Sequence, residues 1–493
     1  MTIPSSVPPR SVRPTAATSS VITASAQRAA EVRFRRALAL MAITLVLPGS
    51  AQLVAGNRDV GRLALRIWFG LLGTGLVALV VLVVHPSWGL TWATDTRLLF
   101  VLRWTLALVA IAWGALLVDA WRIGQPLSYG LSQRRAAVGI NGVLCLVTTG
   151  VLLFGSHLVD VQRQFILTTF GDGRATAAHD GRFNVLLLGG DSGAGRWGLR
   201  PDSMTVASVD AETGRTVLIG LPRNLQDFPF REGTPMAEQF PKGFTDCGAD
   251  YCMLNGVSTW AEDHTRLFKG SEHPGVDATI SAIEGITGLR INYWAMVNLE
   301  GFKDLVNAVG GVTLTVRDRI PVGGLGDDVT GYLEPGTRKL TGFETLWFAR
   351  AREGSDDYSR MARQKCVMNA LLEQVSPQKA LANFSAIAQA SSDMVSTDLP
   401  ASEVDTFLSL ALKARSQKIA TVSLVPPLVN TSDPDIDKIR STVAAAIDKA
   451  EGQAPAPRKR TGPKPDAPVT GGSVGSLSEG YAANQAEDLA SAC

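Results

Sequence analysis

The chain has 493 residues, enough for two or three domains, and a formal net charge of +2. A net charge so close to zero gives no global field that would favour nucleic acid, so we expect no nucleic-acid partner. The mean hydropathy of +0.13 and the 10 tryptophans are high for a soluble protein and indicate that part of the chain lies in a membrane.

The chain begins with a polar segment. Residues 1–35 are rich in Ser, Pro, Thr and Ala and have no apolar period, which predicts a disordered tail. No signal peptide is visible, because the first apolar stretch begins late and leads into further apolar stretches instead of a cleavage site.

Residues 36–160 form a predicted all-α membrane region. Its weakly charged stretches, each about long enough to cross a bilayer as a helix, are residues 37–57, 62–84, 98–118 and 136–159. Pro48, Gly49, Ser50 and Gln52 interrupt the first stretch. We therefore predict that residues 37–57 are re-entrant or interfacial and that the three later stretches cross the bilayer.

Arginines flank these stretches unevenly. They lie before and after the first stretch and between the third and the fourth, whereas residues 85–96 contain no Lys or Arg. These basic residues are Arg28, Arg33, Arg35, Arg36, Arg58, Arg62, Arg66, Arg122, Arg134 and Arg135. By the positive-inside rule they are cytoplasmic, and three crossings then place everything after about residue 160 outside the cell. Four crossings would place it inside. We predict a multi-pass protein of the cell membrane with an extracytoplasmic C-terminal region.

A linker at residues 161–181 leads to a domain at residues 182–451, in which short apolar strands alternate with helices. We expect strands at residues 183–188, 204–209, 216–221, 291–297 and 312–316, and helices at 276–286, 299–309, 357–375, 401–414 and 434–450. This alternation predicts an α/β layer fold with strands buried on both faces. Residues 452–493, rich in Pro, Gly and Ser, are predicted to be a disordered tail.

Two cysteines lie close together in a polar loop, T-D-C-G-A-D-Y-C. In an oxidising compartment Cys247 and Cys252 can close a small disulfide loop, which we favour over two independent thiols. Without a second pair of ligands, C-x4-C is a poor zinc site. Cys366 lies beside Val367 and Met368 on a predicted helix and is interpreted as a core residue.

Polar residues stand where the predicted strands begin or end. Asp191 follows an apolar strand and two glycines, and Asp202 opens the next strand. Two carboxylates at adjacent strand ends can share Mg²⁺ with phosphate oxygens, although an Asp after Gly-Gly is also an ordinary turn residue. Arg223 follows the third strand and points toward the same edge if the strands are neighbours.

Basic residues cluster further along the chain. Arg350 and Arg352 are two positions apart, so they share a face only if that segment is extended. The polar residues of the following helix, with the two acids that could cap it, are Arg360, Arg363, Gln364, Asp356 and Asp357. Converging arginines describe a clamp for phosphates. A solvated, salt-bridged helix face is the alternative.

In chain order these motifs read F-N-V-L-L-L-G-G-D-S, R-P-D-S-M, L-P-R-N, F-A-R-A-R and D-D-Y-S-R-M-A-R-Q. Their order and spacing resemble the LytR–CpsA–Psr family over about residues 180–376, with weaker similarity to residue 450. The resemblance implies a three-layer α-β-α domain with a central mixed sheet. It also implies a phosphotransferase that moves a glycopolymer, as sugar-phosphate, from a polyprenyl pyrophosphate carrier to peptidoglycan during cell-wall assembly.

The resemblance assigns roles to these residues. It implies that Asp191 and Asp202 hold Mg²⁺ or Mn²⁺, and that Asp202, Arg350 and Arg352 are catalytic. The residues implied to bind the pyrophosphate are Arg200, Arg223, Arg350, Arg352, Arg360 and Gln364. The lipid tail would occupy an apolar tunnel within the domain.

Two other functions use the same residues. One is a pyrophosphatase that releases lipid phosphate, with water in place of the sugar acceptor. The other is a non-catalytic envelope protein that binds lipid or glycan. The sequence does not identify the glycopolymer.

Overall fold

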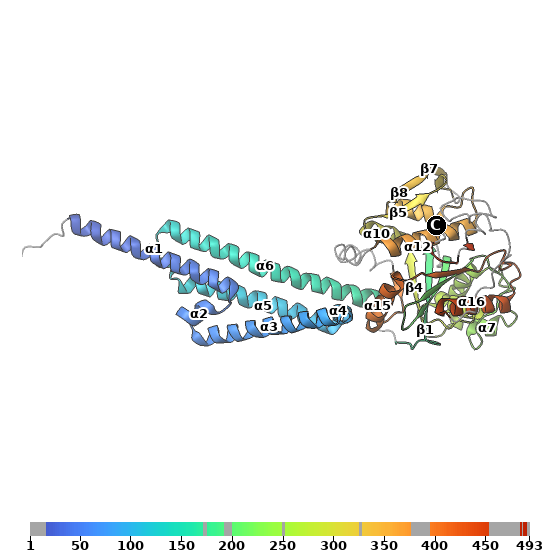
Figure 1. Ribbon diagram of the computed structural model, residues 1–493, viewed down its shortest axis with the longest axis horizontal. Helices are drawn as coiled ribbons and strands as arrows, with labels where there is room; N and C mark the ends of the chain where they lie inside the picture. The colour runs from blue at the N-terminus through green and yellow to red at the C-terminus, as the bar shows by residue number, and fades with distance from the viewer. Residues whose placement is uncertain are drawn as a thin grey trace, which may run out of the picture. The chain divides into compact units, whose positions relative to one another are not determined.

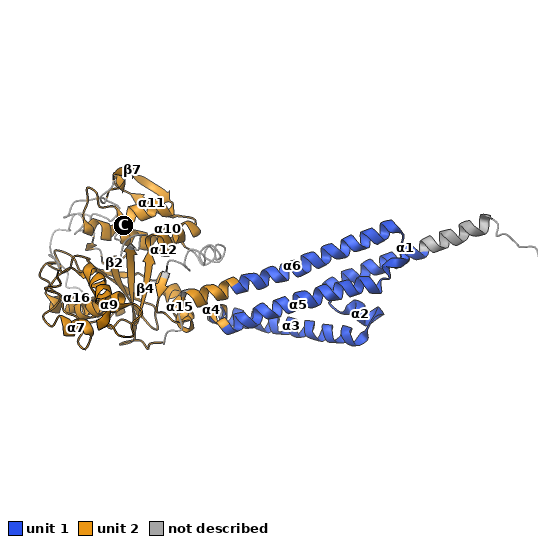
Figure 2. Ribbon diagram, turned by 180° about the vertical axis from the view of Figure 1, so that it is seen from behind, with its two compact units in different colours: residues 1–92, 97–160 blue, residues 93–96, 161–493 orange. Residues whose placement is uncertain are grey.

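The computed structural model describes residues 16–170, 175–191, 200–248, 252–324, 328–375, 395–452, 484–485 and 487–490. The chain divides into two compact units (Figure 2). The first unit comprises Met1–Trp92 and Arg97–Asp160, and the second comprises Ala93–Thr96 and Val161–Cys493.

The N-terminal part of the chain is helical. Its elements are α1 (Ala16–Val46), α2 (Ser50–Ala55), α3 (Arg58–Val84), α4 (Pro86–Thr94), α5 (Thr96–Ile123), a 3-10 turn (Pro126–Ser128) and α6 (Leu131–Thr169). Among the described residues, three segments are long and apolar enough to cross a membrane: Arg58–Val84, Thr96–Ser128 and Leu131–Thr168. The chain therefore has an N-terminal region suited to spanning a membrane.

The first apolar stretch is broken where proline and glycine interrupt it. Helix α1 ends at Val46 and α2 begins at Ser50. Between them Gly49 has φ +95°, and a Cβ there would lie 2.6 Å from the Cβ of Ala64. Only glycine fits a positive φ and this close approach, so the sharp turn is fixed locally by sequence.

The expected disordered tail and the expected linker are both partly helical. Helix α1 begins at Ala16, whereas residues 1–35 were expected to be disordered, because Ala, Gln, Glu and Arg before residue 36 favour a helix continuous with the apolar stretch. Helix α6 continues to Thr169, into the expected linker at 161–181. Between Gly155 and Gly171 the chain contains no Gly or Pro that would end the helix.

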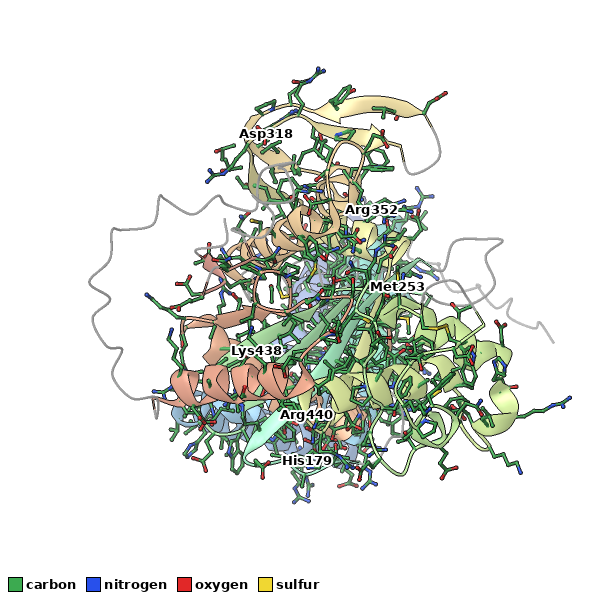
Figure 3. The ribbon with its side chains drawn as sticks, turned by 90° about the vertical axis from the view of Figure 1, so that its right-hand side faces the viewer. His179, Met253, Asp318, Arg352, Lys438 and Arg440 are labelled. Atoms are coloured by element: carbon green, nitrogen blue, oxygen red, sulfur yellow. A yellow bond between two sulfur atoms is a disulfide. The ribbon has the colours of Figure 1, made fainter. Side chains whose placement is uncertain are left out.

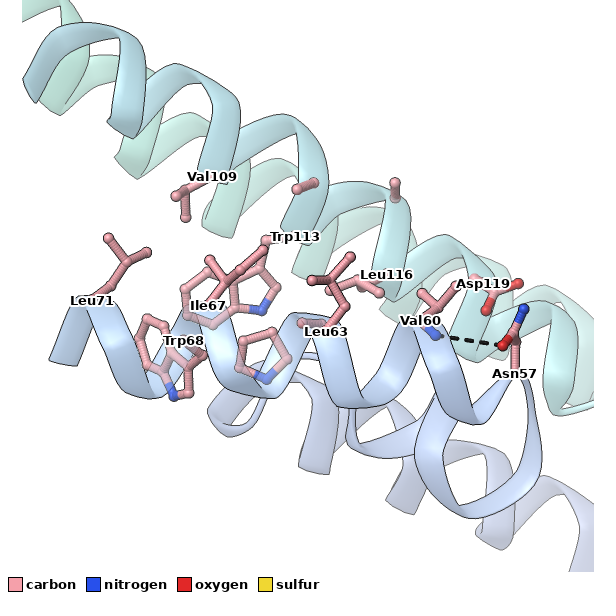
Figure 4. Close-up of a pocket in the computed structure, with 14 residues that line it drawn as sticks. Asn57, Val60, Leu63, Ile67, Trp68, Leu71, Val109, Trp113, Leu116 and Asp119 are labelled. Carbon is pink, nitrogen blue, oxygen red and sulfur yellow. Dashed lines mark hydrogen bonds between the residues drawn. The ribbon is translucent and has the colours of Figure 1, made fainter. Parts of the chain in front are cut away.

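An open groove of about 500 Å³ lies between α3 and α5 (Figure 4). Its wall is apolar except for Asn57 and Asp119, and the rings of Trp68 and Trp113 meet edge to face with centroids 4.8 Å apart. The carboxylate of Asp119 accepts a hydrogen bond of 3.0 Å from Nε2 of Gln52, which is fully buried.

The second unit is built on a mixed six-stranded sheet in the order β10-β3-β2-β1-β4-β9. The strands are β1 (Arg182–Asp191), β2 (Arg200–Asp210), β3 (Thr216–Leu221), β4 (Tyr293–Asn298), β9 (Val395–Thr397) and β10 (Ala420–Ser423). Strands β1 and β4 are parallel, as are β3 and β10, and the other neighbours are antiparallel.

Helices cover both faces of this sheet, which confirms the expected three-layer α-β-α fold (Figure 1). One layer contains α7 (Pro235–Gln239), α8 (Val257–Asp263), α9 (Pro274–Thr287) and α16 (Ile436–Glu451), and the other contains α10 (Leu299–Ala308), α11 (Gly342–Arg350), α12 (Asp357–Gln374) and α15 (Val404–Arg415). Because strand side chains alternate, Leu186 and Leu188 pack in the core under the first layer, while Leu187 and Gly189 face the second.

Two small sheets accompany α11 and α12. Strand β5 (Val312–Val316) pairs with β8 (Gly336–Leu340), and β6 (Ile320–Gly323) pairs with β7 (Val329–Leu333). Their inward side chains and those of α11 and α12 form a second buried core that includes Phe348 and Val367. This core fixes both helices against each other.

The C-terminal tail expected at residues 452–493 is structured in part. Residues 487–490 lie along β10, where Thr421 N donates to Glu487 O (3.0 Å) and Leu489 N donates to Ile419 O (2.9 Å). Leu489 is 1% exposed. Strand β10 is the edge of the sheet, so its open backbone groups provide partners that sequence composition does not reveal.

Those cysteines of the second unit that the structure describes are oxidised. Cys247 and Cys252 form a disulfide with their Cα atoms 5.7 Å apart. Cys366 is buried, as expected of a core residue, and it also takes part in a disulfide, whose partner lies outside the described residues. Cys145, in the first unit, is a free thiol.

Candidate functional site

The site lies where β1 ends and β2 begins. Gly190 pairs with Pro201 and Asp191 with Arg200, after a register shift at Gly189. This pairing places the backbones of Asp191 and Arg200 side by side where the two strands meet the same end of the sheet, and Arg200 is two positions before Asp202 in the chain. The side chains of Asp191 and Arg200 lie outside the described part of the structure.

Arg223, which follows β3, lies between two carboxylates. Its Nη1 is 2.8 Å from Asp202 Oδ1 and its Nε is 2.6 Å from Asp357 Oδ2. Asp357 Oδ1 also lies 3.5 Å from Nη1 of Arg352 and 3.7 Å from Nη2 of Arg360. Asp357 is therefore the centre of a cluster of three arginines.

The cluster stabilises its own charges. Burial disfavours the ionised form of Asp357, but the guanidiniums of Arg360, Arg223 and Arg352 outweigh burial and hold the pKa of this carboxyl below its usual range. Burial likewise opposes the charge on Arg223, yet its bonds to Asp357 and Asp202 raise its pKa. Asp357 and Arg223 are thus both charged at neutral pH.

Arg360 is buried at the start of α12. Its side chain is 3% exposed, its Nη2 donates to the main-chain oxygen of Asp202 (2.9 Å), and burial lowers its pKa. Its Nε is buried and has no hydrogen-bond partner among the described residues. A buried N–H without an acceptor is costly, so this group is suited to an anionic ligand.

A turn brings Arg350 and Arg352 to the same side. Arg350 is the last residue of α11, and Ala351 leaves the helix with φ −53° and ψ 135°. Both arginines therefore line one cavity although the segment before them is helical and not extended. Arg352 lies well above the level of His179, Lys438 and Arg440 in the view of Figure 3.

The cavity lies between the sheet and helices α10, α11 and α12 and has a volume of about 320 Å³. The residues of α12 that line it are Arg360, Gln364, Val367, Met368 and Leu371. Residues at this spacing lie on one face of the helix. At 1.5 Å per residue the face extends over roughly 16 Å, and it is polar at the start of the helix and apolar after that. Phe302 and Leu305 of α10 extend the apolar wall. The cavity therefore has the lengthwise polarity of an amphiphile.

Gln364 is held at the polar part of the wall. Its Oε1 accepts a bond of 3.1 Å from Ser203 Oγ, and its Nε2 lies 3.4 Å from Ala349 O. These contacts connect β2, α11 and α12 around the cavity, so the amide is fixed in orientation.

Comparison with known proteins decides the family. The model of the LytR_cpsA_psr family matches residues 160–437, which is more than half of the 493 residues. The chain belongs to the LytR_cpsA_psr family. The resemblance inferred from the motifs is thereby confirmed.

Two curated relatives are similar to part of this LytR_cpsA_psr chain. Biofilm regulatory protein A of Streptococcus mutans is 25% identical over 269 residues, which cover 52% of this chain and 60% of the relative. The polyisoprenyl-teichoic acid–peptidoglycan teichoic acid transferase TagV of Bacillus subtilis is 25% identical over 281 residues, covering 54% of this chain and 65% of TagV. The match thus spans less than two thirds of either relative. The crystal structure of Bacillus subtilis TagV aligns with a TM-score of 0.39 and 24% identity over 56% of this chain and 100% of that one.

Most residues that the motifs predicted lie together in this LytR_cpsA_psr chain. Asp202, Arg350, Arg352, Arg360 and Gln364 all line the cavity. Arg223 does not line the cavity itself but forms an ion pair with Asp202, which does. The side chains of the other two predicted residues, Asp191 and Arg200, are outside the described structure.

Two residues have roles that sequence reasoning missed. Asp357 was considered only as a possible N-cap, but Asp356 caps α12 by accepting from the amides of Tyr358 and Ser359. The sequence signal that could have indicated an ion pair of Asp357 is its position three residues before Arg360 on the same helix. Arg363 was grouped with the clamp, but it lies under the end of α11, where its Nε donates to Phe348 O (2.8 Å).

The expected divalent metal remains a prediction. The described residues contain no group of three acidic, histidine or cysteine side chains that could hold a metal. Magnesium, however, commonly binds only one or two carboxylates and takes the rest of its shell from water and substrate phosphate. Asp202 suits this role, because its carboxylate is 37% exposed and it lines the cavity, whereas Asp357 is enclosed by arginines.

Proposed function

We propose that this chain is a membrane-anchored phosphotransferase that moves a glycopolymer from a polyprenyl pyrophosphate carrier to peptidoglycan. The supporting observation is one cavity whose wall combines three arginines and Gln364 with a long apolar surface. A ligand with a pyrophosphate head and a polyprenyl tail matches both parts. The names of relatives such as TagV, a polyisoprenyl-teichoic acid–peptidoglycan teichoic acid transferase, agree with this class of substrate.

The arginines supply the charge neutralisation that phosphoryl transfer requires. Arg350, Arg352 and Arg360 bind the pyrophosphate oxygens, with Gln364 as a further donor, and Arg223 holds Asp202 in place. A hydroxyl of the peptidoglycan sugar attacks the phosphorus that carries the glycan and releases its proton to solvent. The bond from that phosphorus to the bridging oxygen breaks, and polyprenyl phosphate leaves with the developing negative charge stabilised by the guanidiniums.

Asp202 and Asp191 are the residues that would hold Mg²⁺ or Mn²⁺. When bound, the metal would neutralise phosphate oxygens and act as a Lewis acid. The pairing of Asp191 with Arg200 supports this assignment, since Asp191 and Asp202 then belong to the same end of two neighbouring strands.

We also propose that the second unit is extracytoplasmic. Three candidate spans and the basic flanks before α1 and between α5 and α6 support a cytoplasmic N-terminus and an outside C-terminus. The two oxidised cysteines Cys247 and Cys252 agree with an oxidising compartment.

The test uses the full-length protein in nanodiscs with a polyprenyl pyrophosphate-linked glycan and peptidoglycan oligomers, with and without Mg²⁺. We expect metal-dependent appearance of glycan on the acceptor. In Arg352→Ala we expect transfer to fall by about 100-fold or more, because a donor to the developing charge is lost.

Arg215→Ala is the matched control, since Arg215 is an arginine at the opposite end of the sheet, where it contacts Glu451. It should transfer normally. Release of lipid phosphate without acceptor labelling would indicate the pyrophosphatase. Tight lipid binding with no turnover would indicate a binding protein, and full activity of Arg352→Ala would overturn the proposed site.

A further inference from the structure

Arg363 is a fully buried arginine one helical turn from the site. It is 0% exposed, and it is not among the residues that line the cavity. Its Nε donates to Phe348 O (2.8 Å) and its Nη2 donates to Ala351 O. Burial lowers its pKa to about 10, so the guanidinium is still charged at neutral pH.

Its two acceptors bracket the end of α11. The last carbonyls of a helix lack partners within the helix and carry a partial negative charge, which a cation stabilises. Phe348 lies in the last turn of α11, and Ala351 is the residue at which the chain leaves the helix. The planar guanidinium thus bonds both to the last helical turn, at Phe348, and to the residue where the chain becomes extended, Ala351.

That turn decides where two arginines point. Arg350 and Arg352 stand on either side of Ala351, and they reach one cavity only because the backbone changes from helical to extended between them. In a continued helix, residues two apart would point about 200° apart.

We propose that Arg363 is a positioning residue that holds the Arg350–Arg352 pair in the geometry that binds pyrophosphate. The inference rests on the proposed function and adds a residue that acts through the others. Arg363 itself is not expected to bind phosphate, since its Nε and Nη2 donate to main-chain oxygens and its side chain does not line the cavity. A lysine in its place would keep the charge but would lack the fork that joins two carbonyls.

The experiment compares Arg363→Lys with the wild-type full-length chain in nanodiscs. Binding of farnesyl pyrophosphate is measured by titration calorimetry, and backbone exchange of residues 345–352 by hydrogen–deuterium mass spectrometry. We expect affinity to fall about tenfold and exchange in residues 345–352 to become faster. Arg363→Gln, which keeps an amide donor but loses the charge, serves as the second variant if Arg363→Lys does not fold.

Arg415→Lys is the matched control. Arg415 caps the end of another helix in the same way, donating to Val375 O (3.0 Å) and Glu373 O (2.9 Å) at the C-terminus of α12. Its replacement removes an equivalent cap without touching the turn at Ala351. It should leave both farnesyl pyrophosphate affinity and exchange in residues 345–352 unchanged.

A double-mutant cycle separates positioning from general destabilisation. If Arg363 acts through Arg352, then Arg363→Lys should cost much less affinity in an Arg352→Ala background than in the wild type. Equal losses in both backgrounds, or unchanged exchange in residues 345–352, would overturn the proposal. Failure of the wild type to bind farnesyl pyrophosphate would instead count against the proposed function, while the exchange result would still decide whether Arg363 holds the turn.

Discussion

At the scale of single residues, the site is organised by Asp357. Its carboxylate contacts Arg223 directly and lies within 4 Å of Arg352 and Arg360. Without it, three guanidiniums would face one another with only Asp202 as a counter-charge, and their mutual repulsion would spread them apart. One acid therefore keeps the arginines close enough to bind a single pyrophosphate.

We predict that Asp357→Asn lowers transfer about 100-fold, because the guanidiniums lose their common anchor. The substitution should also lower the free energy of unfolding by about 2 kcal/mol near neutral pH. Since the folded-state pKa of Asp357 is depressed, its contribution is present above the unfolded value of about 3.9. It is lost as pH falls through the folded-state pKa, so the difference between variant and wild type should narrow in acid.

Asp210→Asn provides the comparison for this prediction. Asp210 lies at the other end of β2, and despite burial the bonds from Thr213 and Glu212 and the charge of Arg182 lower its pKa. Its replacement should cost stability with the same pH trend but leave transfer intact. Equal loss of transfer in both variants would show that Asp357 acts only through folding.

At the scale of elements, the site depends on how closely α10 and α11 approach. A Cβ at Gly342 would lie 1.9 Å from the main-chain oxygen of Lys303, so only glycine permits the contact. The capping box of Thr341 and Glu344 starts α11 at that point. These local features set where α11 begins, and Arg363 sets where it ends.

The C-terminal segment is a second element that the domain requires. We predict that Leu489→Ala lowers the free energy of unfolding by about 2–4 kcal/mol, because a fully buried leucine leaves a cavity. The measurement is denaturant unfolding of the full chain in detergent, followed by near-ultraviolet circular dichroism.

The neighbouring Glu487→Ala is the control for that change. Glu487 forms a surface pair with Lys449 (2.7 Å) and its side chain is 80% exposed, so its loss should change stability by less than about 0.5 kcal/mol. If Leu489→Ala were equally neutral, the segment would not be part of the folded domain.

At the scale of the whole molecule, the number of membrane crossings determines the compartment of the site. The candidate spans in the described part of the chain number three, which is odd, so with these crossings a cytoplasmic N-terminus requires an outside second unit. The proposed lipid-linked substrate and the proposed cell-wall acceptor both fit that compartment.

We predict that a membrane-impermeant maleimide labels Thr91→Cys in intact cells but labels Leu127→Cys only after permeabilisation. The first position lies in the segment without Lys or Arg at residues 85–96, and the second lies between α5 and α6 beside Arg122. The unsubstituted chain gives the background from Cys145, its free thiol. Labelling of Leu127→Cys in intact cells would reverse the orientation.

Much of the fold could be predicted because its signals are local. The apolar runs at residues 183–188, 204–209 and 216–221 became β1, β2 and β3, and the helix expected at 357–375 is α12. Runs of apolar residues and helix-capping residues can be recognised from neighbouring positions in the sequence. The short edge strands β9 and β10 were missed, since such strands take their stability from a partner strand and not from their own composition.

The sequence by itself determined the α/β fold class, the resemblance to the family and the residue types of the site, because each depends on patterns a few positions long. The tertiary structure alone decided that Asp357 and not Asp202 lies at the centre of the arginines, and that Arg363 faces away from the cavity. It also decided that residues 487–490 belong to the domain. These outcomes depend on contacts between segments far apart in the chain. The residues next to a charged side chain or a short polar segment do not reveal which distant partner fixes its position.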